Sequence, residues 1–311
     1  FLLRDSEVSS AGVFVCSRGL QNGLEKVTKV MMTSLLIIMI ILAVNSFFMD
    51  GAKEGLAFYL IPDFERMKQI GIAKTITGAM NQAFFTLSLG IGAMAILGSY
   101  IGKERSLLGE SVNIAILDTF VAITSGLIIF PACFTFHVDQ TSGPSLIFIT
   151  LPNIFNHIPL GRLWGSLFFL FMTFAALSTV IAVFQNIIQY ALDLWGWELK
   201  KSVLVNGILL ILLSVPCVLG LTDWSGFTVA GKNIMDLEDF IVSNNLLPLG
   251  SVVYLLFCVS RYGWGWDNFI QEANAGKGLK IKAWMKPLFC YFVPVGILFI
   301  YIYGMFTFPW H

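Results

Sequence analysis

Charged residues are scarce in this chain: Asp, Glu, Lys and Arg together make up only 12% of its 311 residues. A soluble domain usually carries about 25% charged residues. Apolar and aromatic residues reach 57% of the chain, and its mean hydropathy is +0.80. The shortage of charge therefore excludes an ordinary water-soluble domain and indicates a membrane protein.

Residues that carry enzymatic or nucleic-acid chemistry are also few. The 19 basic and 19 acidic residues balance, which gives no electrostatic case for a nucleic-acid partner. The five cysteines lie far apart without a CxxC pair, as small buried hydrophobes do. No HExxH, GxSxG or glycine-rich phosphate loop is present. These absences argue against an enzyme and against an organic cofactor.

The amino terminus lacks both an initiator Met and the residue pattern of a signal peptide. We expect the chain to be a fragment without its true amino terminus. Residues 1–17 are compatible with the end of an earlier span, although Arg4, Asp5 and Glu7 would then lie at bilayer depth.

Long apolar segments predict a bundle of membrane-spanning helices. A helix needs about 20 apolar residues to cross roughly 30 Å of hydrocarbon. Segments with period-2 alternation are absent, which favours helices over a barrel. We therefore predict an all-α polytopic protein of the plasma membrane with one transporter domain over residues 1–311. Its expected spans are 28–49, 76–102, 110–136, 163–192, 201–222, 240–262 and 284–307.

The distribution of Lys and Arg predicts how these spans are oriented. Most Lys and Arg residues between spans fall on the side of residues 18–29, which places that side in the cytoplasm. The loops 50–74 and 137–162 would then be outer loops. The first is too polar to span, and Pro144 and Pro152 predict that the second is re-entrant or lid-like.

Ser88, Gly90 and Gly92 interrupt the apolar run in the middle of the predicted span 76–102. Glycine destabilises a helix, so we predict a break here. At membrane depth a break is tolerated only where the freed backbone groups face protein or water. Freed carbonyls could bind Na⁺ or an ammonium group, and helix-start amides a carboxylate. Close helix packing through small residues is the alternative.

Two further polar features lie within predicted spans. Asp118 falls about eight residues into its span, where a carboxylate costs a few kcal/mol and is a candidate partner of a cation or proton. An interfacial Asp is the alternative. Ser178 and Thr179 are adjacent hydroxyls that could bind Na⁺ through oxygen. Hydroxyls within a helix also commonly bond to the carbonyl four residues earlier.

At these residues the chain resembles the neurotransmitter:sodium symporter family, and most of all its bacterial sodium-dependent amino-acid transporters. The resemblance extends over nearly the whole chain from Ser17 onward. Its strongest motifs are AFFTLSLGIGA (83–93), SGPSLIFITLPNIF (142–155) and FAALSTVIAVFQN (174–186). It implies a partial LeuT-type fold, from the end of the fourth helix through the eleventh, in which residues 83–93 form a discontinuous sixth helix.

The resemblance also implies roles for individual residues. The substrate, an amino acid or related small amine, would be bound by Phe85, Ser88, Ile91, Thr179 and Val183. One sodium site would include Thr86 and Asp118. The second sodium site would use Ala175 (through its carbonyl), Ser178 and Thr179. The gates would be Asp239 on the outer side and Tyr100 with Asp193 on the inner side, each completed by an arginine outside this chain.

Asp118 departs from the family pattern, in which this position is commonly Asn. Gln82, Thr86 and Asp118 would surround the place where chloride-dependent members hold Cl⁻. A fixed carboxylate would repel chloride and replace its charge. We therefore hypothesise transport that is independent of chloride, with Asp118 as a candidate for proton exchange. Ile91 stands where some relatives carry an aromatic, which leaves the substrate's size open.

The resulting hypothesis is sodium-coupled symport by alternating access, with sodium ions, the substrate and the lipid bilayer as partners. A homodimer is compatible with the sequence. The rival class is a channel or receptor-like membrane protein with a polar cavity around Asp118. Concentrative uptake that needs Na⁺ would favour the symporter, and passive conductance would favour the rival.

Overall fold

The structure is a computed structural model, and it describes residues 22–99, 101–137, 152, 155, 160–220, 224, 226–228 and 232–307. Within these ranges the chain is helical, with an isolated bridge between Arg105 and Lys277 in place of any sheet. Contacts divide the chain into two compact units. Among the described residues, the smaller unit contains those within 22–64 and 117–185, and the larger unit contains those within 65–116 and 186–307.

The smaller unit packs around one face of α2 (Asn22–Ser46). Leu35, Ile38, Met39 and Leu42 recur at helical spacing and are buried. They pack with residues of α7 (Leu107–Thr135) and α9 (Gly161–Trp195), two helices that each contribute a part to both units. A polar link adds to this packing, because Ser46 Oγ donates a hydrogen bond to the Leu127 carbonyl at 2.7 Å.

The predicted outer loop 50–74 contains two short helices, α3 (Ala52–Leu60) and α4 (Phe64–Ile70). In the smaller unit α3 packs closely on α7, since a Cβ on Gly55 would lie 2.6 Å from the Pro131 nitrogen. Proline has no N–H, so Pro131 leaves one backbone carbonyl of α7 without its usual helical donor. The Tyr59 ring stacks on that of Phe130 at 4.8 Å, which fixes α3 against the same part of α7.

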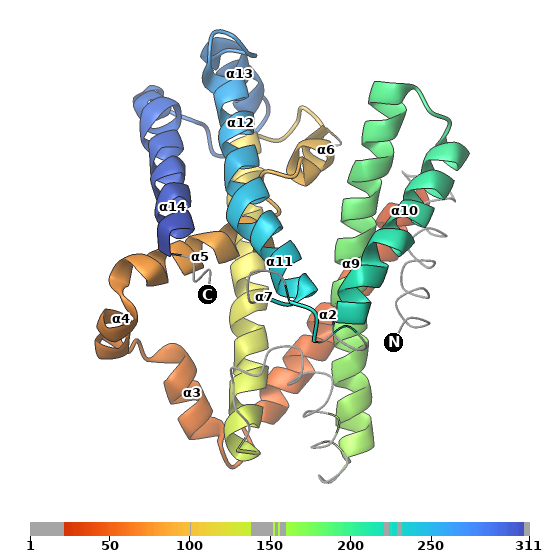
Figure 1. Cartoon of the computed structure of the whole chain (residues 1–311), viewed down its shortest axis with the longest axis vertical. Coiled ribbons are helices and arrows are strands. Elements are labelled where there is room, and N and C mark those ends of the chain that lie inside the picture. The colour runs from red at the N-terminus through yellow and green to blue at the C-terminus, as the bar shows by residue number, and fades with distance from the viewer. Residues whose placement is uncertain are drawn as a thin grey trace. The chain divides into compact units, whose positions relative to one another are not determined.

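The larger unit contains the remaining helices (Figure 1). They are α5 (Ile72–Thr86), α6 (Ala93–Ser99), α10 (Leu199–Gly220), α11 (Ile234–Ile241), α12 (Leu247–Val259), α13 (Trp266–Ala273) and α14 (Val293–Thr307), with the short helices η2 (Val242–Leu246), η3 (Ala283–Met285) and η4 (Leu288–Phe292). The helix α12 lies beside α14 (Figure 1), and Phe84, Leu247, Val252 and Ile297 form a buried cluster between α5, α12 and α14.

Side-chain amides cross-link these helices within the larger unit. Asn81 Nδ2 donates to Asn244 Oδ1 at 3.1 Å, and the Tyr301 hydroxyl donates to Asn245 Oδ1 at 3.2 Å. Both asparagines lie in η2, a π-helical turn between α11 and α12. Hydrogen bonds between helices stabilise membrane bundles, and π-helical turns are frequent at functional sites.

Six helical segments among the described residues are long and apolar enough to cross a bilayer. They are Lys29–Ser46, Leu107–Thr135, Gly161–Trp195, Leu199–Gly220, Ile234–Val259 and Ala283–Phe306. The sequence predicts a seventh span over 76–102, but the structure divides this segment into α5 and α6. Since α5 has 15 residues and α6 has 7, neither helix alone covers about 30 Å at roughly 1.5 Å per residue. The boundaries of all seven spans stay predictions.

Candidate functional site

The helix α5 ends at Thr86, where the backbone forms a hydrogen-bonded stop. The Leu89 amide donates to the Phe84 carbonyl at 3.0 Å, and the Ser88 amide donates to the Phe85 carbonyl at 3.1 Å. This pair of bonds is the Schellman pattern, which requires a left-handed conformation at the residue after the helix end. Ser88 occupies that position and has φ = 51°. Leu89 packs near Phe84, the apolar contact that accompanies the pattern. The α5 helix therefore stops because of local bonding.

Two glycines carry the chain from this stop to the next helix. Gly90 has φ = 84° and Gly92 has φ = 82°, conformations that other residues rarely adopt. The amides of Ala95 and Ile96 then donate to the Gly92 carbonyl at 3.0 and 3.1 Å, which begins α6. Residues 87–92 are thus non-helical between two helices, as the sequence predicts.

The carbonyl of Ile91 in this break is held by a side chain from α9. Asn186 Nδ2 donates to the Ile91 oxygen at 2.9 Å, and Asn186 belongs to the same unit as the break. A backbone acceptor that has lost its helical donor is satisfied here by an amide. This bond fixes the direction of the other backbone groups in the break.

We predict that Asn186→Ala weakens binding of the substrate expected at the break about tenfold. A part-buried acceptor that loses its donor costs about 1–3 kcal/mol, and the Ile91 carbonyl would turn to recover a partner. Equilibrium binding of labelled substrate to the purified full-length protein measures the effect. Asn268→Ala is the control, because the Asn268 amide donates to a carbonyl within its own exposed turn. Equal affinities of Asn186→Ala and wild type would contradict the role of this bond.

The predicted substrate residues are divided between the two units. Phe85 (55% exposed), Ser88 and Ile91 belong to the larger unit, and all three lie at the end of α5 or in the break. Thr179 and Val183 lie on the part of α9 that belongs to the smaller unit. Their joint role in one substrate site stays a prediction.

The predicted sodium residues are divided in the same way. Thr86 is exposed at the end of α5, whereas Asp118 is half-buried in α7 and Ala175 is half-buried in α9. Thr179 Oγ1 donates to the Ala175 carbonyl at 3.2 Å. This is the bond to the carbonyl four residues earlier that the sequence offers as the alternative to sodium binding. Such a hydroxyl still offers oxygen lone pairs to a cation. Ser178 is helical, and its side chain lies outside the described part of the chain.

The two candidate gate residues that the structure describes each have a local partner. Asp239, exposed on α11, accepts a hydrogen bond from Ser243 Oγ at 2.8 Å. Asp193, exposed near the end of α9, accepts one from Gln189 Nε2 at 2.9 Å. Tyr100 lies outside the described residues, as does most of the predicted lid at 137–162. The Gln82 side chain, a candidate for the chloride position, is exposed on α5.

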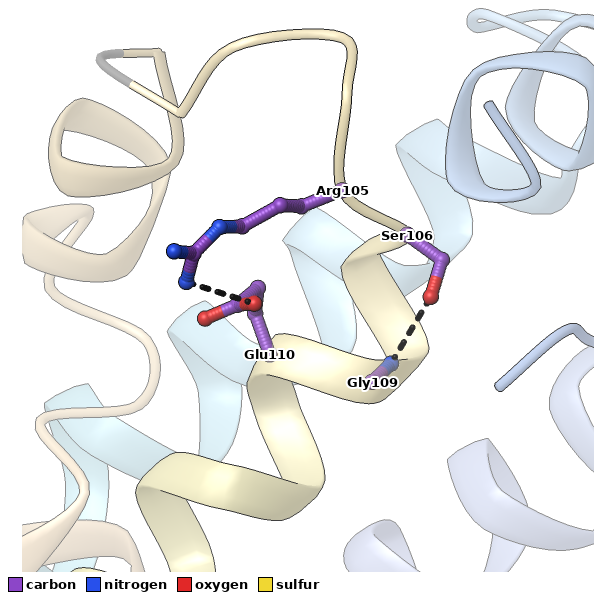
Figure 2. A network of polar contacts seen from close by, with 4 residues as sticks. All are labelled: Arg105, Ser106, Gly109 and Glu110. Carbon is purple, nitrogen blue, oxygen red and sulfur yellow. Dashed lines mark hydrogen bonds and ion pairs between the residues drawn. The ribbon is translucent and has the colours of Figure 1, made fainter. Parts of the chain in front are cut away.

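The helix that carries Asp118 begins at a defined point (Figure 2). Ser106 Oγ accepts a hydrogen bond from the Gly109 amide at 3.3 Å, which is how a serine caps a helix start. The Arg105 guanidinium forms an ion pair with Glu110 at 3.2 Å. Both contacts lie at the amino-terminal end of α7, in the larger unit, and the Ser106 cap stabilises that end of the helix.

A cavity of about 480 Å³ adjoins the break within the larger unit. Its walls are mostly apolar and include Leu87 and Leu89 of the break, with Trp264. Lys103 and Arg105 line it as well, and these cations form ion pairs with Glu272 and Glu110 respectively. The cavity therefore extends from the break to the connection between α6 and α7.

Sequence reasoning gave no role to Asn186, Gly250 or Tyr254, which all contact the break. Asn186 is the last residue of the motif at 174–186. A polar amide inside this apolar segment is a signal that could have identified it. Gly250 and Tyr254 on α12 also meet the break, through Gly90 and Gly92. No pattern near these two residues distinguishes them from other positions on a packed helix.

Comparison with known proteins places this geometry in a family. The profile of the sodium:neurotransmitter symporter family matches residues 8–310. The sodium-dependent transporter YhdH of Bacillus subtilis is 33% identical over 93% of this chain, and a sodium-dependent transporter of Haemophilus influenzae is 31% identical over 94%. The chain spans 63% of the length of each of these two relatives.

Two further proteins are informative. The crystal structure of MhsT in complex with L-phenylalanine superimposes with a TM-score of 0.85 at 34% identity, covering 97% of this chain and 67% of that one. The human sodium- and chloride-dependent creatine transporter 1 is 24% identical over 86% of this chain, which covers 42% of that protein. The likeness to MhsT confirms the predicted all-α, partial LeuT-type fold.

Proposed function

Because the chain belongs to the sodium:neurotransmitter symporter family, we propose that it is part of a secondary active transporter that carries an amino acid or small amine together with Na⁺. It is a multi-pass membrane protein, and its family consists of transporters rather than enzymes. The observation that carries the proposal is the interruption of an apolar helix at residues 87–92.

The break supports binding because it supplies polar backbone groups where an intact helix would supply none. A zwitterionic substrate and a cation both need such groups away from bulk water. Asn186 and the glycines hold the break in one conformation, so the groups are arranged before the ligand arrives. A preorganised site loses less free energy to ordering on binding.

The proposed substrate is an amino acid, with Phe85, Ser88 and Ile91 among its contacts. Phe85 and Ile91 are apolar and would suit an apolar side chain, whereas backbone groups of the break would suit the ammonium and carboxylate. L-Phenylalanine, the ligand of the similar MhsT structure, is therefore the first compound to test. Creatine is a second, since it is carried by a named relative.

The proposed sodium ligands are all oxygen atoms. Asp118 and Thr86 would serve one ion, and the Ala175 carbonyl with the Ser178 and Thr179 hydroxyls a second. Oxygen ligands suit a hard cation, and one carboxylate would balance much of the charge that an ion brings into a membrane helix. Transport is then driven by the sodium gradient and by about 2.3 kcal/mol per charge for each 100 mV.

In the proposed cycle, one binding site opens first to the outer side of the membrane and then to the inner side. Closure near Phe85 and Asp239 would shut the outer side, and movement near Tyr100 and Asp193 would open the inner side. The cavity that runs from Leu87 and Leu89 to Lys103 offers a route for release.

Uptake by the full-length protein in proteoliposomes tests this function. With Na⁺ outside and K⁺ inside, labelled L-phenylalanine or another amino acid is expected to accumulate above its external concentration. Replacing external Na⁺ with K⁺ should abolish accumulation. Uptake that only equilibrates the substrate, and proceeds equally in K⁺, would contradict symport and favour a passive channel.

A further inference from the structure

One face of α12 lies directly against the break. Gly250 and Ser251 lie three and four residues after Leu247, and Tyr254 lies four and three residues after Gly250 and Ser251. The four residues therefore share one side of the helix. Each of them contacts either Gly90 or Gly92. All of these residues belong to the larger unit. The contact joins segments about 160 residues apart in sequence, from Gly90 to Gly250.

The closest approach is between two glycine backbones. A Cβ on Gly250 would overlap the Gly90 carbonyl oxygen and lie 2.9 Å from the Gly90 carbonyl carbon. In the reverse direction, a Cβ on Gly90 would overlap the Leu247 carbonyl oxygen and lie 2.8 Å from the Ser251 nitrogen. The absence of a side chain on both residues is therefore what allows the break to rest on α12.

A second contact lies one helical turn further along α12. A Cβ on Gly92 would lie 2.6 Å from the Tyr254 hydroxyl and 3.6 Å from Asn186 Oδ1. The break thus meets α12 at Gly90 and again at Gly92, while Asn186 holds the carbonyl of the residue between them. Three consecutive residues of the break are each fixed by a different neighbour.

The part of α12 that faces the break is held by further contacts. Leu247 is 2% exposed and packs with Phe84 of α5, just before the break. Ser251 Oγ donates to the Leu247 carbonyl at 2.8 Å, and this bond holds the Ser251 side chain against its own helix. One turn earlier, the bond between Asn81 and Asn244 ties α5 to η2. The helix α12 is therefore fixed to α5 and can act as a stable support for the break.

We propose that Gly250 is a positioning residue for substrate and sodium binding, acting through the backbone of Gly90. The inference rests on the proposed function, since it assigns the break the task of binding. An added methyl at Gly250 would push the Gly90 carbonyl away by roughly an ångström to restore ordinary contact. Backbone groups that bind ligand would then move with Gly90, and affinity would fall without loss of the fold.

Gly250→Ala in the purified full-length protein tests the proposal. We expect the Kd of labelled substrate in Na⁺ to rise about tenfold, with a parallel rise in the Na⁺ concentration that gives half-maximal binding. Gly296→Ala is the matched control, because it adds the same methyl to α14 at a point with no atom within 4 Å. A purely structural role for Gly250 would lower the number of binding sites and leave both constants unchanged.

Tyr254→Phe is a second variant, which adds no atom and should fold even if Gly250→Ala does not. It removes the hydroxyl beside Gly92, and we expect a several-fold rise in the substrate Kd. The inference is overturned if the folded variants keep the wild-type Kd and Na⁺ dependence. Absence of Na⁺-dependent binding in the wild type would instead refute the proposed function, so the two failures are distinguishable.

Discussion

Asp118→Asn is expected to lower the apparent Na⁺ affinity of the full-length protein about a hundredfold. A unit charge about 4 Å from a cation contributes about 4 kcal/mol at an effective dielectric constant of 20, which corresponds to roughly a thousandfold. Asparagine keeps one oxygen ligand, so part of that contribution survives. The Na⁺ concentration for half-maximal binding of labelled substrate measures the change.

The same variant is expected to become sensitive to chloride. If the Asp118 carboxylate replaces the charge of a bound anion, wild-type transport should be equal in chloride and gluconate. Asp118→Asn should then recover part of its Na⁺ affinity when chloride is present. Asp267→Asn removes an equal charge from an exposed position in α13. This control should change neither the Na⁺ affinity nor the response to chloride. Wild-type transport that requires chloride would contradict this interpretation of Asp118.

Gly90→Ala is expected to reduce substrate binding at least a hundredfold. The left-handed conformation at φ = 84° costs about 1–2 kcal/mol for any residue with a Cβ. Overpacking against the Leu247 carbonyl and the Ser251 amide adds about 1–3 kcal/mol. Together these costs favour a rearranged break in which the backbone groups no longer meet the substrate.

Gly78→Ala provides the comparison for this prediction. Gly78 lies on α5, two turns before the break, and an added methyl there meets no atom within 4 Å. Its variant should bind substrate like the wild type, because alanine also favours a helix over glycine. Binding of substrate to Gly90→Ala with wild-type affinity would show that the conformation of the break is unimportant.

The sequence predicted the break because its cause is local. Glycines at positions 90 and 92 permit positive φ, and a Schellman stop needs only residues from Phe84 to Leu89. The serine at position 88 is the less expected part, since glycine is the usual residue at a left-handed helix stop. Local chemistry was therefore sufficient to place the interruption within one or two residues.

Hydropathy alone does not locate a helix boundary where a cap or a turn decides it. The span expected from residue 240 begins with a helix at Ile234, because Asn233 Oδ1 accepts a hydrogen bond from the Asp236 amide at 2.8 Å. The π-helical turn over Val242–Leu246 depends on partners in α5 and α14. Hydropathy describes neither feature, since it averages over about 20 residues.

The support of the break by α12 could not be predicted at all. Gly250 sits in an apolar helix where glycine commonly serves packing, and nothing nearby marks Gly90 as its neighbour. Contacts of this kind come from the tertiary arrangement. The same holds for the pairing of Asn186 with the Ile91 carbonyl, although an amide in an apolar helix does predict some polar partner.

In the proposed transporter, the backbone of the break is expected to bind the substrate together with sodium. A structure of the full-length protein determined with L-phenylalanine, or another transported amino acid, and Na⁺ tests it most directly. We predict density for the substrate within hydrogen-bond distance of the main chain of residues 88–92. Density for the substrate bound elsewhere, with an uninterrupted helix across residues 72–99, would show that the break is not the binding site.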